Sequence, residues 1–192
     1  QEIDAALVRA ESRSAVEHAV CDVLADAEPY AAAWIGEYDP EDHRLDFRAS
    51  AGFNDGVPDE RPTGEESPNL APESGVRPES GPGARTIETG QVTVTRSAED
   101  AVFEDIEADT PDQGYHSVAT VPIVHGDDLY GLLAVYTDRP SSFDDREREL
   151  LEKLGEDVGY TLDAVEVRSE LQEFEEAVEH AGHAICITDA DG

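Results

Sequence analysis

The 192-residue sequence contains very little positive charge. Lysine occurs once, at Lys153, and all the other basic residues are arginines spread thinly along the chain. Nucleic acids and anionic membranes are bound through clusters of basic side chains. Because no such cluster occurs here, we expect this segment to bind neither nucleic acid nor a membrane. No apolar run approaches the roughly 20 residues that cross a bilayer.

Methionine is absent and cysteine is scarce. The lack of methionine even at position 1 predicts that the chain is a segment of a longer protein. The two cysteines, Cys21 and Cys186, lie far apart without the spacing of a metal site. This usage fits a reducing compartment, and no signal peptide is visible, so we expect a cytoplasmic location and no metal centre.

Acidic residues are abundant instead. There are 46 of them, and the formal net charge is -33. A disordered chain is one interpretation of such charge, but 39% of the residues are hydrophobic and they recur with clear periodicity. The sequence therefore predicts a folded domain with a halophilic surface, adapted to the multimolar salt of a haloarchaeal cytoplasm, where carboxylates are screened from one another.

Periodicity predicts the elements of this domain. An amphipathic helix is indicated over 14–27, with Ser14 and Glu17 at capping-box spacing. Extended runs over 30–38 and 44–51 predict one hairpin, and runs over 117–124 and 129–137 predict another. The second pair is apolar at nearly every position, which indicates a sheet covered on both faces. We therefore predict the α+β class, an antiparallel sheet flanked by helices on both faces.

A long helix is predicted after Asp144, with two apolar seams. The first contains Leu151, Leu154, Val158, Leu162 and Val165. The second has strict spacing of four and three and contains Tyr160, Ala164, Val167, Leu171, Phe174 and Val178. We expect the first seam to pack on the sheet and the second to pair with another chain as a homodimer. A break near Ser169 that gives two unrelated helices is the alternative.

The order of these elements resembles a GAF domain over residues 12–168. The most specific block runs from Ser117 to Leu162 and includes "VPIVHGDDLYGLLAVYT" and "FDDRERELLEKLGEDVGYTL". The tail "FEEAVEHAGHAICITDADG" resembles the opening of a PAS domain, with Ala184 to Ile187 as its first strand. The resemblance implies a GAF domain over 1–168 whose loop at 52–83 covers a pocket, a linker helix over 169–181 and a truncated PAS start over 182–192.

The resemblance also implies a small-molecule pocket on one face of the sheet. Our candidates for its lining are Trp34, Arg48, Phe53, Arg85, Tyr115 and His116. The two arginines suit a carboxylate or phosphate, but pairing with surface acids is the alternative for both. Trp34 has a core role as its alternative, and His116 a structural or surface role, because no second metal ligand stands at useful spacing from it.

Some GAF domains bind a bilin covalently and others reduce sulfoxides, and both activities need cysteines in the pocket. Cys21 falls on the first helix and Cys186 in the next module, so we expect neither chemistry. No nucleophile, base and orienting group share a readable spacing, so we expect this segment not to be an enzyme. The identity of a ligand stays open.

The resemblance implies a sensory or regulatory domain of a signal-transduction protein, which binds a small molecule or relays a signal through a dimerising terminal helix. Its partners would be a second copy and the PAS and output domains of the same chain. The output would be a two-component histidine kinase or a transcription regulator similar to the bacterio-opsin activator. The alternative is an architectural dimerisation module without a ligand.

Overall fold

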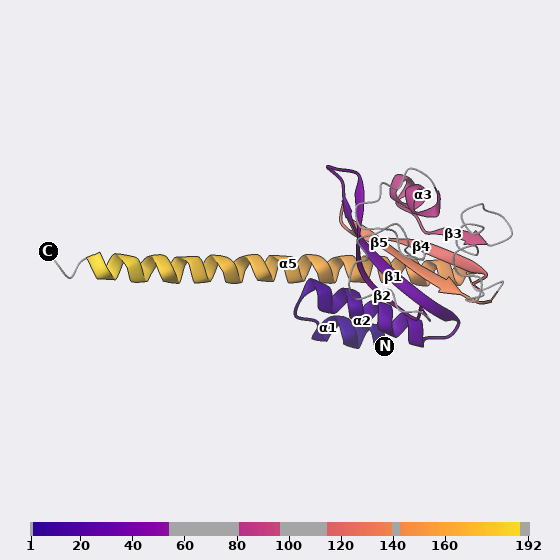
Figure 1. The fold of residues 1–192 in the computed structure, drawn as a ribbon, viewed down its shortest axis with the longest axis horizontal. Coiled ribbons are helices and arrows are strands. Elements are labelled where there is room, and N and C mark those ends of the chain that lie inside the picture. Colours follow the sequence, from indigo (N-terminus) through magenta and orange to yellow (C-terminus); the bar gives the residue numbers. More distant parts are fainter. Residues whose placement is uncertain (1, 54–80, 97–114, 140–142, 189–192) are drawn as a thin grey trace, which may run out of the picture.

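The computed structural model describes residues 2–53, 81–96, 115–139 and 143–188 (Figure 1). Its elements are, in chain order, helices and strands α1 (Glu2–Arg9), α2 (Arg13–Asp26), β1 (Tyr30–Asp39), β2 (Arg44–Ala51), α3 (Gly81–Thr89), β3 (Thr93–Arg96), β4 (Ser117–His125), β5 (Asp128–Thr137) and α5 (Asp145–Thr188). The predicted α+β class is confirmed. Most of the predicted loop over 52–83 lies outside the described residues, and its last three residues form the start of α3.

The five strands form one antiparallel sheet in the order β2-β1-β5-β4-β3. Both predicted hairpins are confirmed. The β1–β2 hairpin closes at the pair Asp39 and Arg44, and the β4–β5 hairpin closes at the pair His125 and Asp128. Gly126 occupies the second turn with a φ of 62°, a left-handed conformation that glycine adopts without steric cost.

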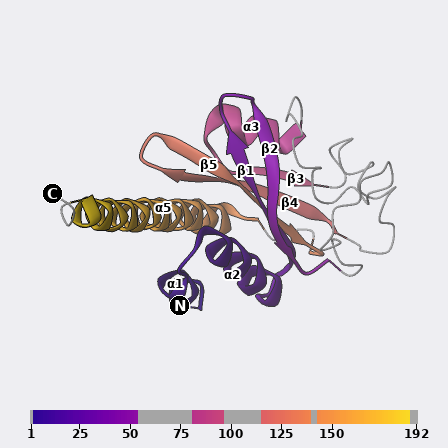
Figure 2. The same cartoon turned by 60° about the vertical axis from the view of Figure 1, so that its left-hand side comes forward.

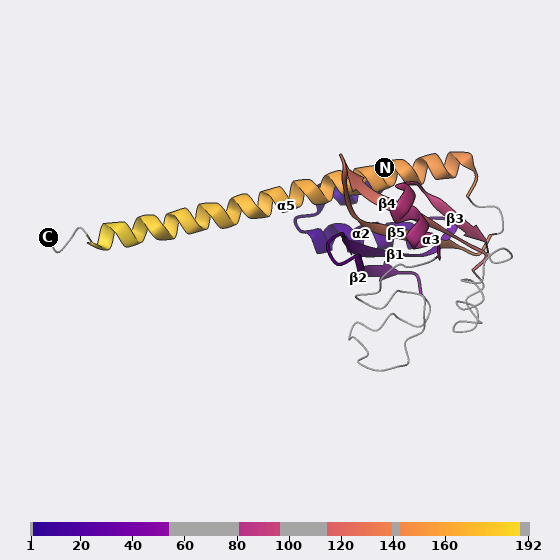
Figure 3. The ribbon, with the colours of Figure 1, turned by 90° about the horizontal axis from the view of Figure 1, so that it is seen from above.

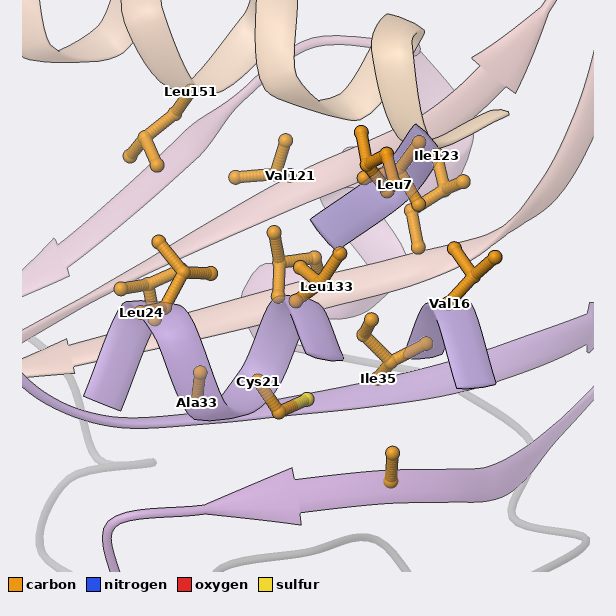
Figure 4. Close-up of a cluster of buried hydrophobic side chains, with 14 of the residues drawn as sticks. Leu7, Val16, Cys21, Leu24, Ala33, Ile35, Val121, Ile123, Leu133 and Leu151 are labelled. Atoms are coloured by element: carbon orange, nitrogen blue, oxygen red, sulfur yellow. The ribbon is translucent and has the colours of Figure 1, made fainter. Parts of the chain in front are cut away.

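Helices cover both faces of the sheet, as the continuous apolar strands predict. Figure 2 shows α1, α2 and α5 on one face and α3 on the other. Alternation along β1 explains why both faces are apolar. Ala33 and Ile35 belong to the core beneath α2 and α5, whereas Ala32 and Trp34 belong to the core on the opposite face. Figure 4 shows side chains of α2, α5 and the sheet meeting in the first core.

Helix α2 begins one residue before the predicted start, and its cap differs from the prediction. Ser12 is the N-cap, and its Oγ accepts a hydrogen bond from the Ala15 backbone N–H at 3.2 Å. Ser14 lies in the first turn of the helix. Glu17 therefore does not close a capping box, and its side chain is buried against the sheet.

Helix α5 is continuous over 44 residues, so the predicted alternative of a break near Ser169 is wrong. Asp144 caps it as predicted, because its Oδ1 accepts from the Glu147 backbone N–H at 2.9 Å. The first seam packs on the sheet as expected: Leu151, Val158, Leu162 and Val165 are buried and Leu154 is partly buried. Beyond Val165 the helix runs away from the body of the domain (Figures 1 and 3).

Two glycines bring α5 close to strand β4. A Cβ at Gly155 would lie 2.2 Å from the Pro122 carbonyl oxygen, and one at Gly159 would lie 2.2 Å from the Val124 carbonyl oxygen. Any larger residue would push the helix off the strand. The spacing of four places both glycines on the face of α5 that meets the sheet.

The predicted strand at Ala184 to Ile187 is wrong in this structure. Helix α5 continues through Gly182 and these residues to Thr188. A strand needs a neighbouring strand for its backbone hydrogen bonds, whereas a helix satisfies them within itself. The predicted turn at 189–192 lies outside the described residues, and the assignment of 182–192 to a PAS domain stays a prediction. None of the helices described has the length and apolar character that a bilayer crossing requires.

Candidate functional site

Four aromatic residues gather on the face of the sheet that carries α3, and we call them the aromatic cluster. They are Trp34 on β1, Phe53 after β2, Tyr115 before β4 and Tyr136 on β5. The Trp34 indole Nε1–H donates to the Tyr136 hydroxyl oxygen at 3.2 Å. Three of the six predicted lining residues are therefore brought together here.

The rings of the aromatic cluster pack edge to face or tilted. Their centroids are 5.3 Å apart for Tyr115 and Tyr136, 5.7 Å for Phe53 and Tyr136, and 6.2 Å for Phe53 and Tyr115. These separations fall within the favourable range for aromatic pairs. Trp34, Tyr115 and Tyr136 are only 7%, 6% and 4% exposed.

Both tyrosines of the aromatic cluster are neutral at physiological pH. Burial raises the pKa of Tyr115 to about 12, and the neighbouring Tyr136 adds to this shift. Burial also raises the pKa of Tyr136 to about 12, against the smaller opposing effect of the Trp34 hydrogen bond. The cluster therefore offers flat apolar surfaces and uncharged hydroxyl groups, with no formal charge among its four members.

Helix α3 and the start of β4 border the aromatic cluster. The buried Thr86 Oγ1–H donates to the Thr120 carbonyl oxygen at 3.3 Å, and Ile87 packs against the cluster. The neighbouring Arg85 is exposed. His116 is also exposed, and its backbone N–H donates to the Thr137 carbonyl oxygen at 2.8 Å. Both predicted residues thus lie at the border rather than within the cluster.

Arg48 lies on the opposite face of the sheet, so its place in the predicted lining set is corrected. Ile35 pairs with Ala49 and Gly36 with Phe47, which leaves Arg48 as the extra residue of a β-bulge. Its Nε donates to Glu17 Oε2 on α2 at 3.2 Å. The alternative interpretation, pairing with acids, is therefore right for Arg48.

Arg48 belongs to an ion network that joins four elements: Arg13 and Glu17 on α2, Glu37 on β1, Arg48 on β2 and Glu166 on α5. Glu17 is 1% exposed and accepts hydrogen bonds from both arginines. Arg13 also donates to Glu166, one residue past the last buried position of α5. Sequence reasoning missed this network because residues on four elements meet only in the fold.

Cys21 lies in the core between α2 and the sheet, on the face opposite the aromatic cluster. Burial raises the pKa of its thiol to about 12, and the nearby Asp22 and Glu17 carboxylates add to this shift. A protonated, buried thiol is a poor nucleophile. In the part of the chain that the structure describes, no group of three His, Cys, Asp or Glu side chains is placed to hold a metal ion.

The second predicted seam of α5 lies on the surface, and we call it the exposed seam. Its large members have exposed fractions of 63% for Tyr160, 49% for Val167, 59% for Leu171, 68% for Phe174 and 54% for Val178. Ala164 is partly buried. A stripe of this length on a helix that leaves the domain is available to a partner.

Sequence reasoning missed Tyr136, the residue to which the other members of the aromatic cluster turn. The signal was present in β5, where Leu132, Ala134 and Tyr136 alternate with residues of the other core. Because both sets are apolar, alternation alone did not separate the two faces.

Comparison with known proteins agrees with this geometry. The sequence model of the GAF domain family matches residues 10–163. The chain is 28% identical over 165 residues to the bacterioopsin transcriptional activator of Halobacterium salinarum, which covers 84% of this chain and 21% of that protein. The chain therefore spans about a fifth of the length of this relative.

Solved structures share the fold. The GAF domain of the Acinetobacter phosphoenolpyruvate-protein phosphotransferase superposes with a TM-score of 0.62 at 18% identity, covering 86% of this chain and 90% of that one. The free methionine-R-sulfoxide reductase of Neisseria meningitidis, in complex with its substrate, superposes with a TM-score of 0.65 at 14% identity, covering 86% and 87%.

Proposed function

The chain belongs to the GAF domain family, and on this premise we propose that it is a non-catalytic sensory domain that binds a small molecule at the aromatic cluster and relays this binding through α5. The observation that carries the proposal is the division of labour between the two faces of one sheet. The aromatic cluster occupies one face, and the root of α5 packs on the other.

The sheet offers a short path between the two faces. Trp34 and Ile35 are adjacent on β1, yet Trp34 belongs to the aromatic cluster and Ile35 to the core beneath the helices. Leu132 and Leu133 on β5 are divided in the same way. A ligand that fits one position of these strands better than another would shift the populations of the arrangements of α5.

The chemistry of the aromatic cluster supports a particular ligand class. Neutral tyrosine hydroxyls and stacked rings suit a flat molecule with uncharged hydrogen-bonding groups. Arg85 and His116 at the border are placed for a polar or anionic substituent at one end of such a molecule. Arg48 is engaged elsewhere, so an anion held between two arginines is not favoured.

A regulatory role is better supported than catalysis. Cys21 is remote from the aromatic cluster and protonated, so a reductase reaction at the cluster would lack its thiol. The reductase neighbour shares the fold alone. The relative that regulates transcription supports a transcriptional output, which would lie outside this chain.

The proposal is tested by thermal shift in 2 M KCl against a panel of nucleobases, aromatic acids, flavins and other planar metabolites. A ligand that binds only the folded state raises the melting temperature in proportion to its concentration. The rise should be lost in Trp34→Leu and kept in Tyr130→Phe, a control whose hydroxyl contacts Asp163 on the opposite face. A rise that survives in Trp34→Leu would place binding elsewhere.

One observation favours a second candidate, an architectural dimerisation module. The members of the aromatic cluster already fill one another's space, since three of them are less than 8% exposed. In that case no compound of the panel would change the melting temperature, while the pairing of the exposed seam would persist.

A further inference from the structure

We propose that the exposed seam binds a second copy of this chain in parallel and that salt concentration controls this contact, so that pairs form in high salt and separate in low salt. The inference rests on the proposed function, in which two copies pair through α5. It adds the orientation of the pair and the physical variable that regulates it.

The exposed seam has the register of a two-stranded coiled coil. Ala164, Leu171 and Val178 occupy one core position of successive heptads, and Tyr160, Val167 and Phe174 occupy the other. Every side chain from Val167 to Val178 is exposed. This part of α5 extends away from the body of the domain (Figures 1 and 3). The body of the same chain is therefore not placed to cover the seam.

Charge favours a parallel partner. In a parallel pair, the residue before one core position faces the residue five places further along in the second copy. Asp163 of one copy then faces Arg168 of the other, and the reverse contact occurs by symmetry. Asp163 is already held at the edge of the seam, because its Oδ1 accepts from the Tyr130 hydroxyl at 2.9 Å. Arg168 is the sole cation between Tyr160 and His180 apart from the histidine itself.

The remaining charges oppose pairing. The next contact of the same kind brings Glu170 of one copy to Glu175 of the other, and this repulsion also occurs twice. Seven carboxylates lie between Tyr160 and His180. At about 0.1 M salt the Debye length is roughly 10 Å and these charges repel one another across the pair, whereas at about 1 M it falls to roughly 3 Å. Apolar burial of the seam can then prevail.

The sign of this dependence identifies the occupant. A basic protein bound to so acidic a helix would be held by opposite charges and released by salt. A second copy carries the same acids, so salt strengthens its binding. The same apolar stripe thus predicts opposite salt effects for the two kinds of partner.

Sedimentation equilibrium of the full chain tests the proposal between 0.3 and 3 M KCl, over the range in which circular dichroism shows unchanged helix content. We expect the dimer dissociation constant to fall as KCl rises. Glu175→Lys turns both repulsive contacts into attractive ones and should tighten the dimer about tenfold at 0.3 M KCl, with a weaker salt dependence. Glu176→Lys makes the same charge change on the outer side of the helix and should have a clearly smaller effect.

Orientation is tested by oxidation of Leu171→Cys in a Cys186→Ser background. A parallel pair brings the two introduced thiols together and yields a disulfide-linked dimer, whereas Ser169→Cys on the outer side should not. A dimer that crosslinks equally through both positions would overturn the parallel order. A dimer whose affinity does not rise with salt, or equal effects of the two lysine variants, would overturn salt control and leave the proposed function standing. A monomer at every salt concentration would overturn both the inference and the relay through α5.

Discussion

Glu17 shows how far a residue's role depends on its neighbours in space. Its spacing from Ser14 predicts a capping box, yet the side chain is 1% exposed and binds Arg13 and Arg48. A buried carboxylate with two guanidinium partners is retained because its removal would leave two cations with fewer acceptors.

We expect Glu17→Gln to lower the free energy of unfolding by about 2 kcal/mol, since hydrogen bonds to charged groups are the ones lost. Glu166→Gln removes another acceptor of Arg13, but Glu166 is 42% exposed and should cost less than about 1 kcal/mol. Urea denaturation of both variants in 2 M KCl measures the difference. Equal losses would contradict the role of the buried carboxylate.

Buried acids of another kind predict a loss of stability in alkali. Burial raises the pKa of Cys21, Tyr115 and Tyr136 to about 12 in the folded protein. The unfolded values are about 8.5 for cysteine and about 10 for tyrosine. Because the folded pKa is the higher one, the folded state holds these protons more tightly, and their contribution is complete below the unfolded pKa and lost as pH rises towards 12.

The free energy of unfolding should therefore fall between about pH 9 and 12. Tyr136→Phe removes one of the titrating groups, so this variant should lose less stability over the same interval, although it starts lower for want of the Trp34 hydrogen bond. Denaturation curves at half-unit steps measure both slopes. A stability that rises with pH in this interval, or identical slopes, would count against the assignment.

At the scale of single residues, the site could be predicted only in part. Trp34, Phe53 and Tyr115 meet as expected because the strands that carry them are adjacent in one sheet. Arg48 does not join them, because a bulge turns it to the other face. A shift of one residue moves a side chain across a sheet, and nothing in the local pattern marks where the shift occurs.

Elements with long periodic patterns could be predicted well, and short ones only with their partners in view. The two seams of α5 were readable because many residues repeat the spacing and Asp144 marks the start. The strand at 184–187 was wrong because an apolar run of four fits a strand or a helix, and the choice depends on whether a neighbouring strand is present.

The close approach of α5 to β4 predicts strong effects of adding a methyl group. Gly155→Ala and Gly159→Ala would each place a Cβ against a backbone carbonyl oxygen, 2.2 Å away. Backbone atoms have little room to yield, so each variant should lower the free energy of unfolding by about 1–3 kcal/mol despite the better helix propensity of alanine.

Ser169→Ala, on the exposed part of the same helix, is the matched control and should be neutral or slightly stabilising. Chemical denaturation in 2 M KCl compares the three variants. If the two glycine variants were as stable as the control, the contact between α5 and β4 would have to be looser than the structure has it.

At the scale of the whole molecule, charge and core act against each other. A net charge of -33 repels itself in the compact state, while two apolar cores on one sheet hold the state together. We expect the free energy of unfolding to rise when KCl is increased from 0.1 to 2 M. Phe174→Ser, which weakens the exposed seam, should show the same rise at low protein concentration, because this effect belongs to the single domain. A fall with KCl would contradict the account.

The central claim is that the aromatic cluster is a sensory site. Trp34 is the only tryptophan of the chain, so its fluorescence reports on the cluster directly. The decisive measurement is a titration of Trp34 emission in 2 M KCl with the planar compound that gives the largest thermal shift. The account predicts a saturable change in emission that Tyr115→Ala weakens and Tyr130→Phe leaves unchanged. A melting temperature that rises while Trp34 emission stays constant would show that the compound binds elsewhere and would contradict the claim.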